Sequence, residues 1–165
     1  MHPSSTRPHP HLRRLSAAIL FSLSALTAAQ SIADSIKLGL NYPSTGRYKE
    51  QGIAQAQGAM LAVEEINSSG GVLGKPLELL TANSASMPQR AITNVDNLVA
   101  QGAVMLFGGA SSDVAIAAGK EAAKHRIIYF GTLTYANETT GSEGHRYMFR
   151  EPYNAWMAAK AISSY

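Results

Sequence analysis

Two serines that follow a glycine-rich turn are the residues best placed for chemistry in this chain. The segment at 106–123 reads LFGGASSDVAIAAGKEAA, so an apolar run ends in two glycines and an alanine, and Ser111 and Ser112 then open an alanine-rich stretch. Serine is favoured at a helix N-cap, and the free N–H groups and dipole of a helix N-terminus suit a carboxylate or another anion. The segment is a candidate anion site. The competing interpretation is that one serine caps the helix and the glycines only make a tight turn.

Three tyrosines stand in two other turn segments. Tyr42 and Tyr48 lie in NYPSTGRYKEQG, and Tyr135 lies in GTLTYANETTG. Aromatic walls with a few polar groups are typical of small-molecule pockets. Tyrosines half-buried at the bases of loops are the alternative interpretation, so each of the three is a candidate ligand contact and also a candidate structural residue.

The sequence lacks the motifs of common catalytic and cofactor sites. SGGVLGKP departs from the phosphate-binding GxxxxGK[ST] loop at Ser69 and Pro76, NYPSTG stands where a dinucleotide fingerprint GxGxxG is expected, and Asp113 replaces the last glycine of a GxSxG elbow. His125 and His145 have no metal-ligand partner at helical or loop spacing, so we expect both to be structural or solvated. We therefore predict no catalytic residue, no metal site and no cofactor, and a protein that is not an enzyme.

Alternating segments predict the scaffold that positions these residues. Strand-like runs lie at 36–43, 76–80, 103–107, 126–131 and 146–149. Helical patterns lie at 51–67, 88–101, 112–124 and 155–163. One face of the first helix carries five apolar residues, Ile53, Ala56, Met60, Val63 and Ile66. This order predicts a doubly wound α/β domain with a parallel sheet covered by helices on both sides. Ligands bind such sheets beyond the carboxyl ends of the strands, so the loops after the first, third and fourth strands form the candidate site.

The first 33 residues have the layout of a secretory signal peptide. Three arginines precede the apolar stretch LSAAILFSLSALTAA at 15–29, and small residues follow it. A membrane anchor is the alternative, but the apolar run is shorter than the roughly 20 residues that span a bilayer. The small residues permit cleavage after Ala33 or, alternatively, after Ala29.

Composition narrows the class of protein further. The 165 residues include 14 Lys+Arg and 11 Asp+Glu, and three basic and no acidic residues precede Asp34, so the remainder is balanced. The basic excess belongs to the leader, and we expect no nucleic-acid partner. The chain has no cysteine, which excludes disulfides, thiolate metal ligands, a thiol nucleophile and a lipidated tether. The expected location is periplasmic.

Four segments resemble a known family. IKLGLNYPSTGRYKEQG, GAMLAVEEINSSGGVLGKPLELL, FGGASSDVAIAAGKEAAKHRIIYFGT and GHRYMFREPYNAWMAAKAI are similar to type I periplasmic solute-binding proteins. More narrowly, they resemble the branched-chain amino acid and amide-type (leucine-binding-protein-like) receptors of ABC importers, and AVEEIN..GG..GKPLEL is their most specific pattern. The resemblance implies a flavodoxin-like strand order, a small-molecule ligand of the amino acid, amide or urea class, and an ABC permease in the inner membrane as partner.

The resemblance also implies which residues contact the ligand. Ser112, or Ser111 with a shift of one residue, corresponds to the serine that binds the ligand's carboxylate. The main chain of Leu133 and the hydroxyl of Tyr135, or of Thr134 with a shift, correspond to the groups that hold the amino or amide end.

The chain departs from the family pattern at one position and in length. Relatives often have an aromatic residue in the loop after the first strand, where this chain has Gln51 with Tyr48 close by. Members are also more than twice as long as residues 34–165, and they cross to a second lobe near REPYNAW. We therefore expect a removed signal peptide at 1–33, lobe 1 at 34–150, and the first crossover with the beginning of a truncated lobe 2 at 151–165.

Two functions fit the resemblance and the candidate site. The first is the extracytoplasmic substrate-binding component of an ABC transporter for branched-chain amino acids or related amides and urea, present as an N-terminal fragment. The alternative is an exported ligand sensor that acts on a regulatory or signalling partner. Because the second pocket wall is missing from the expected fragment, we expect weak ligand binding and an aggregation-prone chain.

Overall fold

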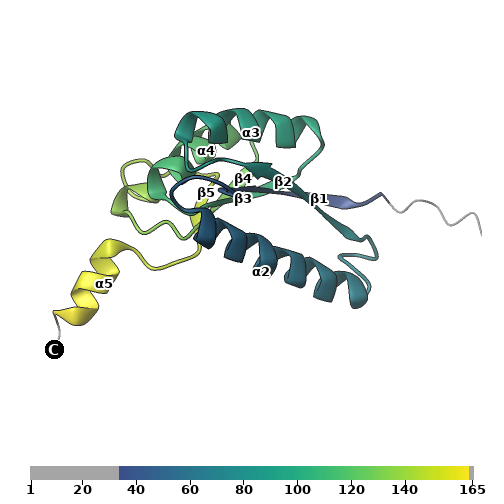
Figure 1. Ribbon diagram of the computed structural model, residues 1–165, viewed down its shortest axis with the longest axis horizontal. Coiled ribbons are helices and arrows are strands. Elements are labelled where there is room, and N and C mark those ends of the chain that lie inside the picture. The colour runs from purple at the N-terminus through teal and green to yellow at the C-terminus, as the bar shows by residue number, and fades with distance from the viewer. Residues whose placement is uncertain (1–33, 164–165) are drawn as a thin grey trace, which may run out of the picture. The chain divides into compact units, whose positions relative to one another are not determined.

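A computed structural model describes residues 34–163, which form a parallel β-sheet with helices on both faces (Figure 1). The elements in chain order are β1 (Ile36–Tyr42), α2 (Lys49–Ser68), β2 (Leu77–Asn83), α3 (Pro88–Ala100), β3 (Met105–Gly109), α4 (Ser112–Lys124), β4 (Ile128–Thr132), the 3-10 turn η2 (Asn137–Thr139), β5 (Met148–Arg150) and α5 (Ala155–Ile162). The predicted doubly wound α/β class is confirmed. The predicted signal peptide and its cleavage positions lie outside the described residues.

The sheet has the order β2-β1-β3-β4-β5, and every neighbouring pair is parallel. The chain moves outward from β1 to β2 and then returns to the other side of β1 to form β3, so the direction of winding reverses between β1 and β3. The register pairs Asn41 with Gly108 and Gly109 with Thr132, which aligns the carboxyl ends of β1, β3 and β4. A crevice at a topological switch point is therefore expected at this edge of the sheet.

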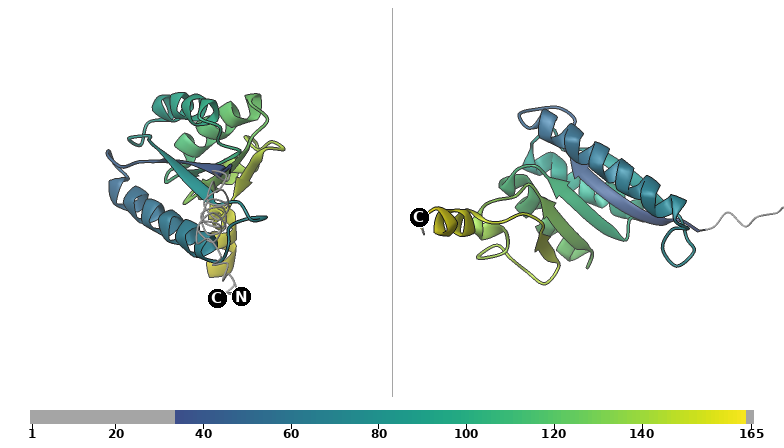
Figure 2. Two further views of the ribbon diagram at one scale, coloured as in Figure 1. Left: turned by 90° about the vertical axis from the view of Figure 1, so that its right-hand side faces the viewer. Right: turned by 90° about the horizontal axis from the view of Figure 1, so that it is seen from below.

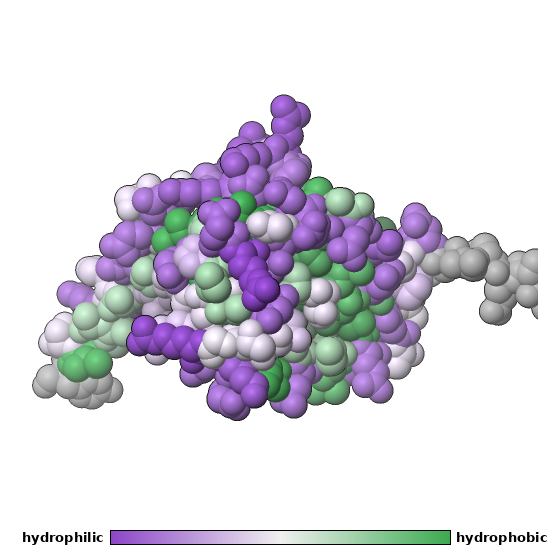
Figure 3. All heavy atoms as spheres, turned by 45° about the horizontal axis from the view of Figure 1, so that its top comes forward, coloured by the Kyte–Doolittle hydropathy of each residue, from purple (hydrophilic) through white to green (hydrophobic). Residues whose placement is uncertain are grey.

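The main hydrophobic core lies between the sheet and the layer formed by α3 and α4. It contains small and branched side chains from both helices together with two large residues of the central strands: Ala91, Val95, Leu98, Val114, Ala115, Ala118, Ala122, Leu106 and Tyr129. The alanines of α4 allow the helix to approach the strands closely, because they add little side-chain bulk at the contact. The outer surface of this layer is predominantly hydrophilic, with smaller apolar areas between the polar side chains (Figure 3).

Helix α2 covers the other face of the sheet mainly over β1 and β2 (Figure 2). The predicted apolar face of this helix exists, but it is not fully buried, since Met60 is 54% exposed and Ile66 is 38% exposed. Gly52 and Ala56 are the buried residues of α2. Helical periodicity identified which residues share a face, and it could not show how far the sheet extends beneath them.

An apolar groove of ≈ 380 Å³ lies beside α2, where described residues leave part of the sheet uncovered. Its walls are mainly apolar residues from α2 and from four strands: Leu38, Ala59, Ala62, Val63, Ile66, Leu77, Met105, Phe107 and Phe130. At its margin the rings of Phe130 and Phe149 stack with centroids 5.2 Å apart, and Phe149 stays 43% exposed.

Within residues 34–163, no helix combines the length and the apolar character needed to cross a bilayer.

Candidate functional site

A hollow of ≈ 510 Å³ lies at the carboxyl ends of the central strands. Its lining comes from the loop after β1 and the start of α2, from the turn between β3 and α4, and from the loop after β4: Tyr48, Gln51, Ala110, Ser111, Ser112, Asp113, Leu133 and Tyr135. The volume falls within the usual range for small-molecule sites. Six of the eight predicted ligand-contacting residues are brought together here, from three segments that are far apart in the sequence.

The N-terminus of α4 faces this hollow with its backbone donors uncapped by the serines. Ser111 is the N-cap residue, with extended backbone (φ −151°, ψ 149°), and its side chain makes no capping hydrogen bond. Its hydroxyl instead donates to the Asp113 carboxylate. The interpretation that a serine side chain merely caps this helix is therefore wrong. The first helical N–H to bond within α4 is that of Ala115, which donates to the Ser111 carbonyl at 3.0 Å, so the N–H groups before it are available to an acceptor in the hollow.

Ser112 holds the neighbouring loop in place. Its hydroxyl oxygen accepts a hydrogen bond from the Ala136 N–H at 3.1 Å, which joins the start of α4 to the segment after β4. Ala110 makes a second link between the same two regions, because its N–H donates to the Thr132 carbonyl at 3.2 Å. Two walls of the hollow are thus fixed to each other by hydrogen bonds.

The two glycines of the turn serve packing inside the fold. A Cβ on Gly108 would lie 2.1 Å from the carbonyl oxygen of Asn41 on the neighbouring strand, and a Cβ on Gly109 would lie 3.0 Å from the Ala115 Cβ. Both glycines have positive φ, 131° and 124°. Of the two glycines and the alanine that follow the apolar run, only Ala110 lines the hollow.

Two residues other than glycine adopt left-handed backbone conformations at the strand ends. Ala110, which follows β3, has φ 62°, and Leu133, which follows β4, has φ 54°. This region is uncommon for such side chains and costs of order 1–3 kcal/mol at a residue that is held there. Both residues line the hollow, and strained backbone of this kind concentrates at ligand sites.

Two tyrosines from different segments form part of the wall. The N–H of Tyr48 donates to the Ser86 hydroxyl at 3.0 Å, which ties the beginning of α2 to the loop after β2. Tyr135 is 40% exposed, and its ring lies 5.2 Å from that of Tyr153, centroid to centroid. Its carbonyl accepts the Ala155 N–H at 2.8 Å, so the start of α5 is attached to this wall.

Tyr42 and Thr134 do not line the hollow. Tyr42 is the last residue of β1 and is half-buried. Thr134 is completely buried, and its hydroxyl has no hydrogen-bond partner among the described residues. Of the two neighbouring hydroxyl residues proposed from the sequence, it is Tyr135 that faces the hollow. Ala110 and Asp113 also line the hollow and were not predicted to do so. Their positions directly beside Ser111 and Ser112 are the sequence feature that could have identified them.

Among the described residues, the lining of the hollow contains no catalytic set. Ser111 and Asp113 form a hydroxyl–carboxylate pair, and neither described histidine lines the hollow. A nucleophilic serine normally requires an adjacent base that is itself oriented by a third group. The donors that are present, namely helix N–H groups and hydroxyls, are suited to holding a small anion or a polar ligand.

A second hollow of ≈ 790 Å³ lies on the outer side of α4 and shares Ser112 and Asp113 with the first. This second hollow is larger, but it lies on the outer surface of the layer formed by α3 and α4. Its lining includes exposed charged side chains such as Lys120 and Lys124. The smaller hollow is the better candidate because it lies at the reversal of the winding.

Comparison with known proteins identifies the class. Residues 35–165 match the family described as periplasmic binding protein, and the chain belongs to this family. The predicted family resemblance is confirmed.

Named relatives fall within a narrower group. The chain is 30% identical over 139 residues to the leucine-, isoleucine-, valine-, threonine-, and alanine-binding protein of Pseudomonas aeruginosa, covering 84% of this chain and 36% of the relative. It is 34% identical over 146 residues to Leu/Ile/Val-binding protein homolog 8 of Brucella suis, covering 88% and 35%. The chain thus spans about a third of the length of the curated relatives it matches.

Solved structures agree with this grouping. The branched-chain amino acid transporter substrate binding protein LivJ of Streptococcus pneumoniae, in complex with isoleucine, is 30% identical with a TM-score of 0.69, covering 73% of this chain and 34% of that one. The closed conformation of the leucine-, isoleucine-, valine-, threonine-, and alanine-binding protein of Brucella ovis is 24% identical with a TM-score of 0.71, covering 80% and 37%, and this likeness concerns the fold alone.

Proposed function

We propose that the chain supplies one ligand-binding lobe of an extracytoplasmic substrate-binding protein of an ABC transporter, with a branched-chain aliphatic amino acid or a related amide as ligand. The observation that carries this proposal is the hollow at the switch point, where the uncapped N-terminus of α4 meets the tyrosines of two other loops. The relatives that bind leucine, isoleucine and valine by name support the choice of ligand class.

The ligand's carboxylate binds at the beginning of α4 in this proposal. The N–H groups of Ser112 and Asp113 precede the first internal hydrogen bond of the helix, and the helix dipole favours a negative charge there by about 0.3–1 kcal/mol. The Ser112 hydroxyl, which accepts from the Ala136 N–H, keeps its own O–H as a further donor at the same place.

The amino or amide end of the ligand binds at the loop after β4. The left-handed conformation of Leu133 turns the main chain there, and Tyr135 brings a hydroxyl and an aromatic ring to the same wall. Tyr48 and Gln51 complete the lining on the side of α2.

The proposal includes a second lobe that closes over the ligand and a periplasmic location. Gln51 and Tyr135 are exposed although they line the hollow, so a ligand on this surface keeps one side in water. Good small-molecule sites bury about 70–90% of the ligand surface. Residues 34–150 act as lobe 1 and residues 151–165 as the first crossover in this arrangement, and the permease in the inner membrane is the partner.

Nuclear magnetic resonance can test the carboxylate site on the chain itself. L-leucine is titrated into the ¹⁵N-labelled protein, and we expect weak, saturable shifts at the backbone N–H groups of Ser112, Asp113 and Leu133. Isopentylamine, which keeps the side chain and the amine of leucine and lacks the carboxylate, serves as the matched control ligand. It is expected to leave the Ser112 and Asp113 signals unchanged.

Two results contradict the proposal. One is equal shifts at Ser112 and Asp113 with leucine and with isopentylamine, which would remove the carboxylate from the N-terminus of α4. The other is a saturable response confined to residues outside the hollow, or no response to leucine, isoleucine, valine or acetamide at millimolar concentrations.

A further inference from the structure

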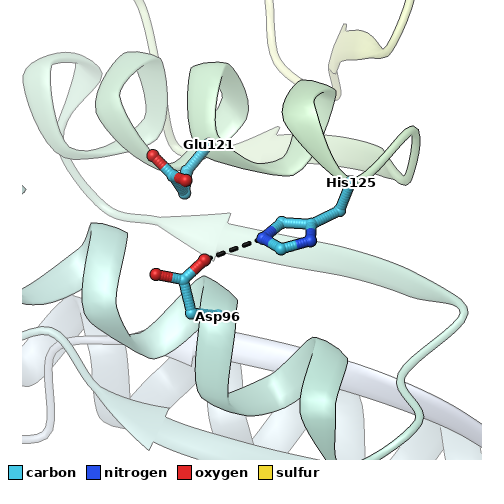
Figure 4. Close-up of side chains that lie close together, drawn as sticks. All are labelled: Asp96, Glu121 and His125. Carbon is cyan, nitrogen blue, oxygen red and sulfur yellow. Dashed lines mark hydrogen bonds and ion pairs between the residues drawn. The ribbon is translucent and has the colours of Figure 1, made fainter.

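Three potential metal ligands meet between α3 and α4, away from the candidate ligand site. Asp96 comes from α3, Glu121 comes from the last turn of α4, and His125 is the C-cap residue of α4 (Figure 4). One donor atom from each residue, a carboxylate oxygen or an imidazole nitrogen, lies within 4.8 Å of the other two. We propose that these three side chains form a binding site for a divalent transition-metal ion of the zinc class.

The spacing on α4 places two of the ligands on one side of the helix. Glu121 and His125 are four residues apart, which is about one helical turn, so their side chains are neighbours on the surface. The expectation from the sequence that His125 lacks a ligand partner at helical spacing is therefore wrong. The third ligand is 29 residues from His125, and only the packing of α3 against α4 brings it near.

The observed distances are close to those of an occupied site. Zinc bound at roughly 2.0–2.2 Å in tetrahedral geometry has neighbouring ligand atoms about 3.4 Å apart. The Asp96 Oδ1 and His125 Nε2 atoms are 2.7 Å apart, and the donor atoms of all three residues lie within 4.8 Å. Bringing donor atoms that are at most 4.8 Å apart to a separation of about 3.4 Å requires them to approach each other by about 1.4 Å or less.

The burial of the ligands suits a partly preformed site. The Glu121 side chain is only 12% exposed, so its carboxylate has little freedom. Asp96 and His125 are 51% and 34% exposed, which leaves the outer side of the cluster open to an entering ion and to water as a further ligand. Two carboxylates this close repel each other, and a divalent cation between them removes that repulsion.

Lys124 competes with the ion for the Glu121 carboxylate. Its ammonium lies 2.6 Å from the Glu121 carboxylate, and its side chain is 70% exposed. Because an exposed lysine on a flexible stem gains little from such a pair, the ammonium can move into solvent when a metal binds. Removal of this charge is expected to strengthen metal binding, whereas it would merely break a salt bridge if the cluster had no affinity for metal.

The donor set favours zinc and its neighbours over magnesium or calcium. One imidazole nitrogen suits zinc, copper, nickel or iron, whereas magnesium and calcium prefer sites made of oxygen ligands alone. Bound metal would connect α3 to the C-terminal end of α4, at the opposite end of α4 from Ser112. The site would brace the helix layer behind the candidate ligand site.

Zinc titration by isothermal calorimetry tests the proposal. The full chain also carries histidines at 2, 9 and 11, so the background protein has His2→Gln, His9→Gln and His11→Gln. We expect one zinc ion per chain in this background. His125→Gln and Asp96→Asn are each expected to weaken binding by at least about tenfold, since even the loss of a residue that supports a metal ligand typically costs that much.

Two further variants distinguish a specific metal site from unspecific attraction of zinc to surface carboxylates. Glu143→Gln removes a carboxylate that pairs with Lys120 of α4 and lies outside the Asp96, Glu121 and His125 cluster, and it should leave the zinc affinity unchanged. Lys124→Ala should raise the affinity. The proposal is overturned if the background protein binds no zinc at millimolar concentrations, if His125→Gln and Asp96→Asn bind like the background, or if Lys124→Ala weakens binding.

Discussion

The close approach of β1 and β3 at Gly108 gives a prediction whose size can be worked from the structure. The change is Gly108→Ala. The new Cβ would lie 2.1 Å from the Asn41 carbonyl oxygen, whereas real Cβ atoms essentially never come within 3.0 Å of such an atom. The residue also has φ 131°, a conformation that alanine rarely adopts.

The expected cost combines two effects. The strands must separate by about 1 Å at the Asn41–Gly108 pair, which weakens one or two ladder hydrogen bonds that contribute about 1 kcal/mol each. Backbone strain at an unsuitable positive φ adds roughly 1–3 kcal/mol. Together these give a loss of about 2–5 kcal/mol, which is a large part of the 5–15 kcal/mol that stabilises ordinary domains. We therefore expect Gly108→Ala to be largely unfolded or close to it.

Urea unfolding followed by circular dichroism measures this loss, and Gly58→Ala is the matched control. Gly58 lies within α2, and a Cβ there would have no atom within 4 Å. Alanine at that position should stabilise the protein by about 0.5–1 kcal/mol, because it has the higher helix propensity. The reasoning is refuted if Gly108→Ala unfolds within 1 kcal/mol of the parent as measured by this assay, or if the two substitutions have similar effects.

Three further outcomes are expected. Burial raises the pKa of Tyr129 far above its usual value of 10.0, and the Tyr129 hydroxyl has no hydrogen-bond partner among the described residues. Tyr129→Phe should therefore raise the free energy of unfolding by about 1–2 kcal/mol in urea titrations at neutral pH. Above pH 10 the unfolded chain releases the Tyr129 hydroxyl proton while the folded protein keeps it, so the parent should lose stability as the pH rises. Tyr129→Phe should lose less stability over the same range, and parallel pH profiles of the two proteins would contradict this. In the leucine titration followed by nuclear magnetic resonance, Asp113→Asn should strengthen binding by about two- to fivefold, because a negative charge at the N-terminus of α4 competes with the ligand's carboxylate. Weaker binding would contradict a carboxylate site at this helix end. The groove beside α2 and the exposed Phe149 should make the chain bind anilinonaphthalene sulfonate and self-associate with rising concentration, whereas a monomer in sedimentation that leaves the dye dark would count against this surface being accessible.

Much of the fold could be predicted because its strands are nearly continuous apolar runs between clear turn residues. The segment at 103–107 contains only apolar residues, and such a run in an alternating α/β pattern fits a central parallel strand. The structure places β3 at Met105–Gly109, two residues later than the pattern indicated, because the glycines continue the ladder. Tertiary contacts, and the close approach of Asn41 in particular, fixed this boundary.

The candidate site was predictable in outline and unpredictable in detail. Loops at the carboxyl ends of parallel strands must meet, so Ser112 and Tyr135 could be grouped from the sequence. The hydrogen-bond partners of these side chains could not be predicted, because the choice of Ser111 to contact Asp113 and not to cap the helix depends on local rotamers. The neighbourhood of His125 was missed for a different reason, since Asp96 joins it only through helix packing.

The attachment of α5 to the loop after β4 has a mechanical consequence. The N–H of Ala155 donates to the Tyr135 carbonyl at 2.8 Å, and the N–H of Trp156 donates to the Asn137 side-chain oxygen at 3.0 Å. With the adjacent rings of Tyr135 and Tyr153, these bonds couple α5 to one rim of the hollow. Any swing of α5 must therefore either break both bonds or move that rim of the hollow with it.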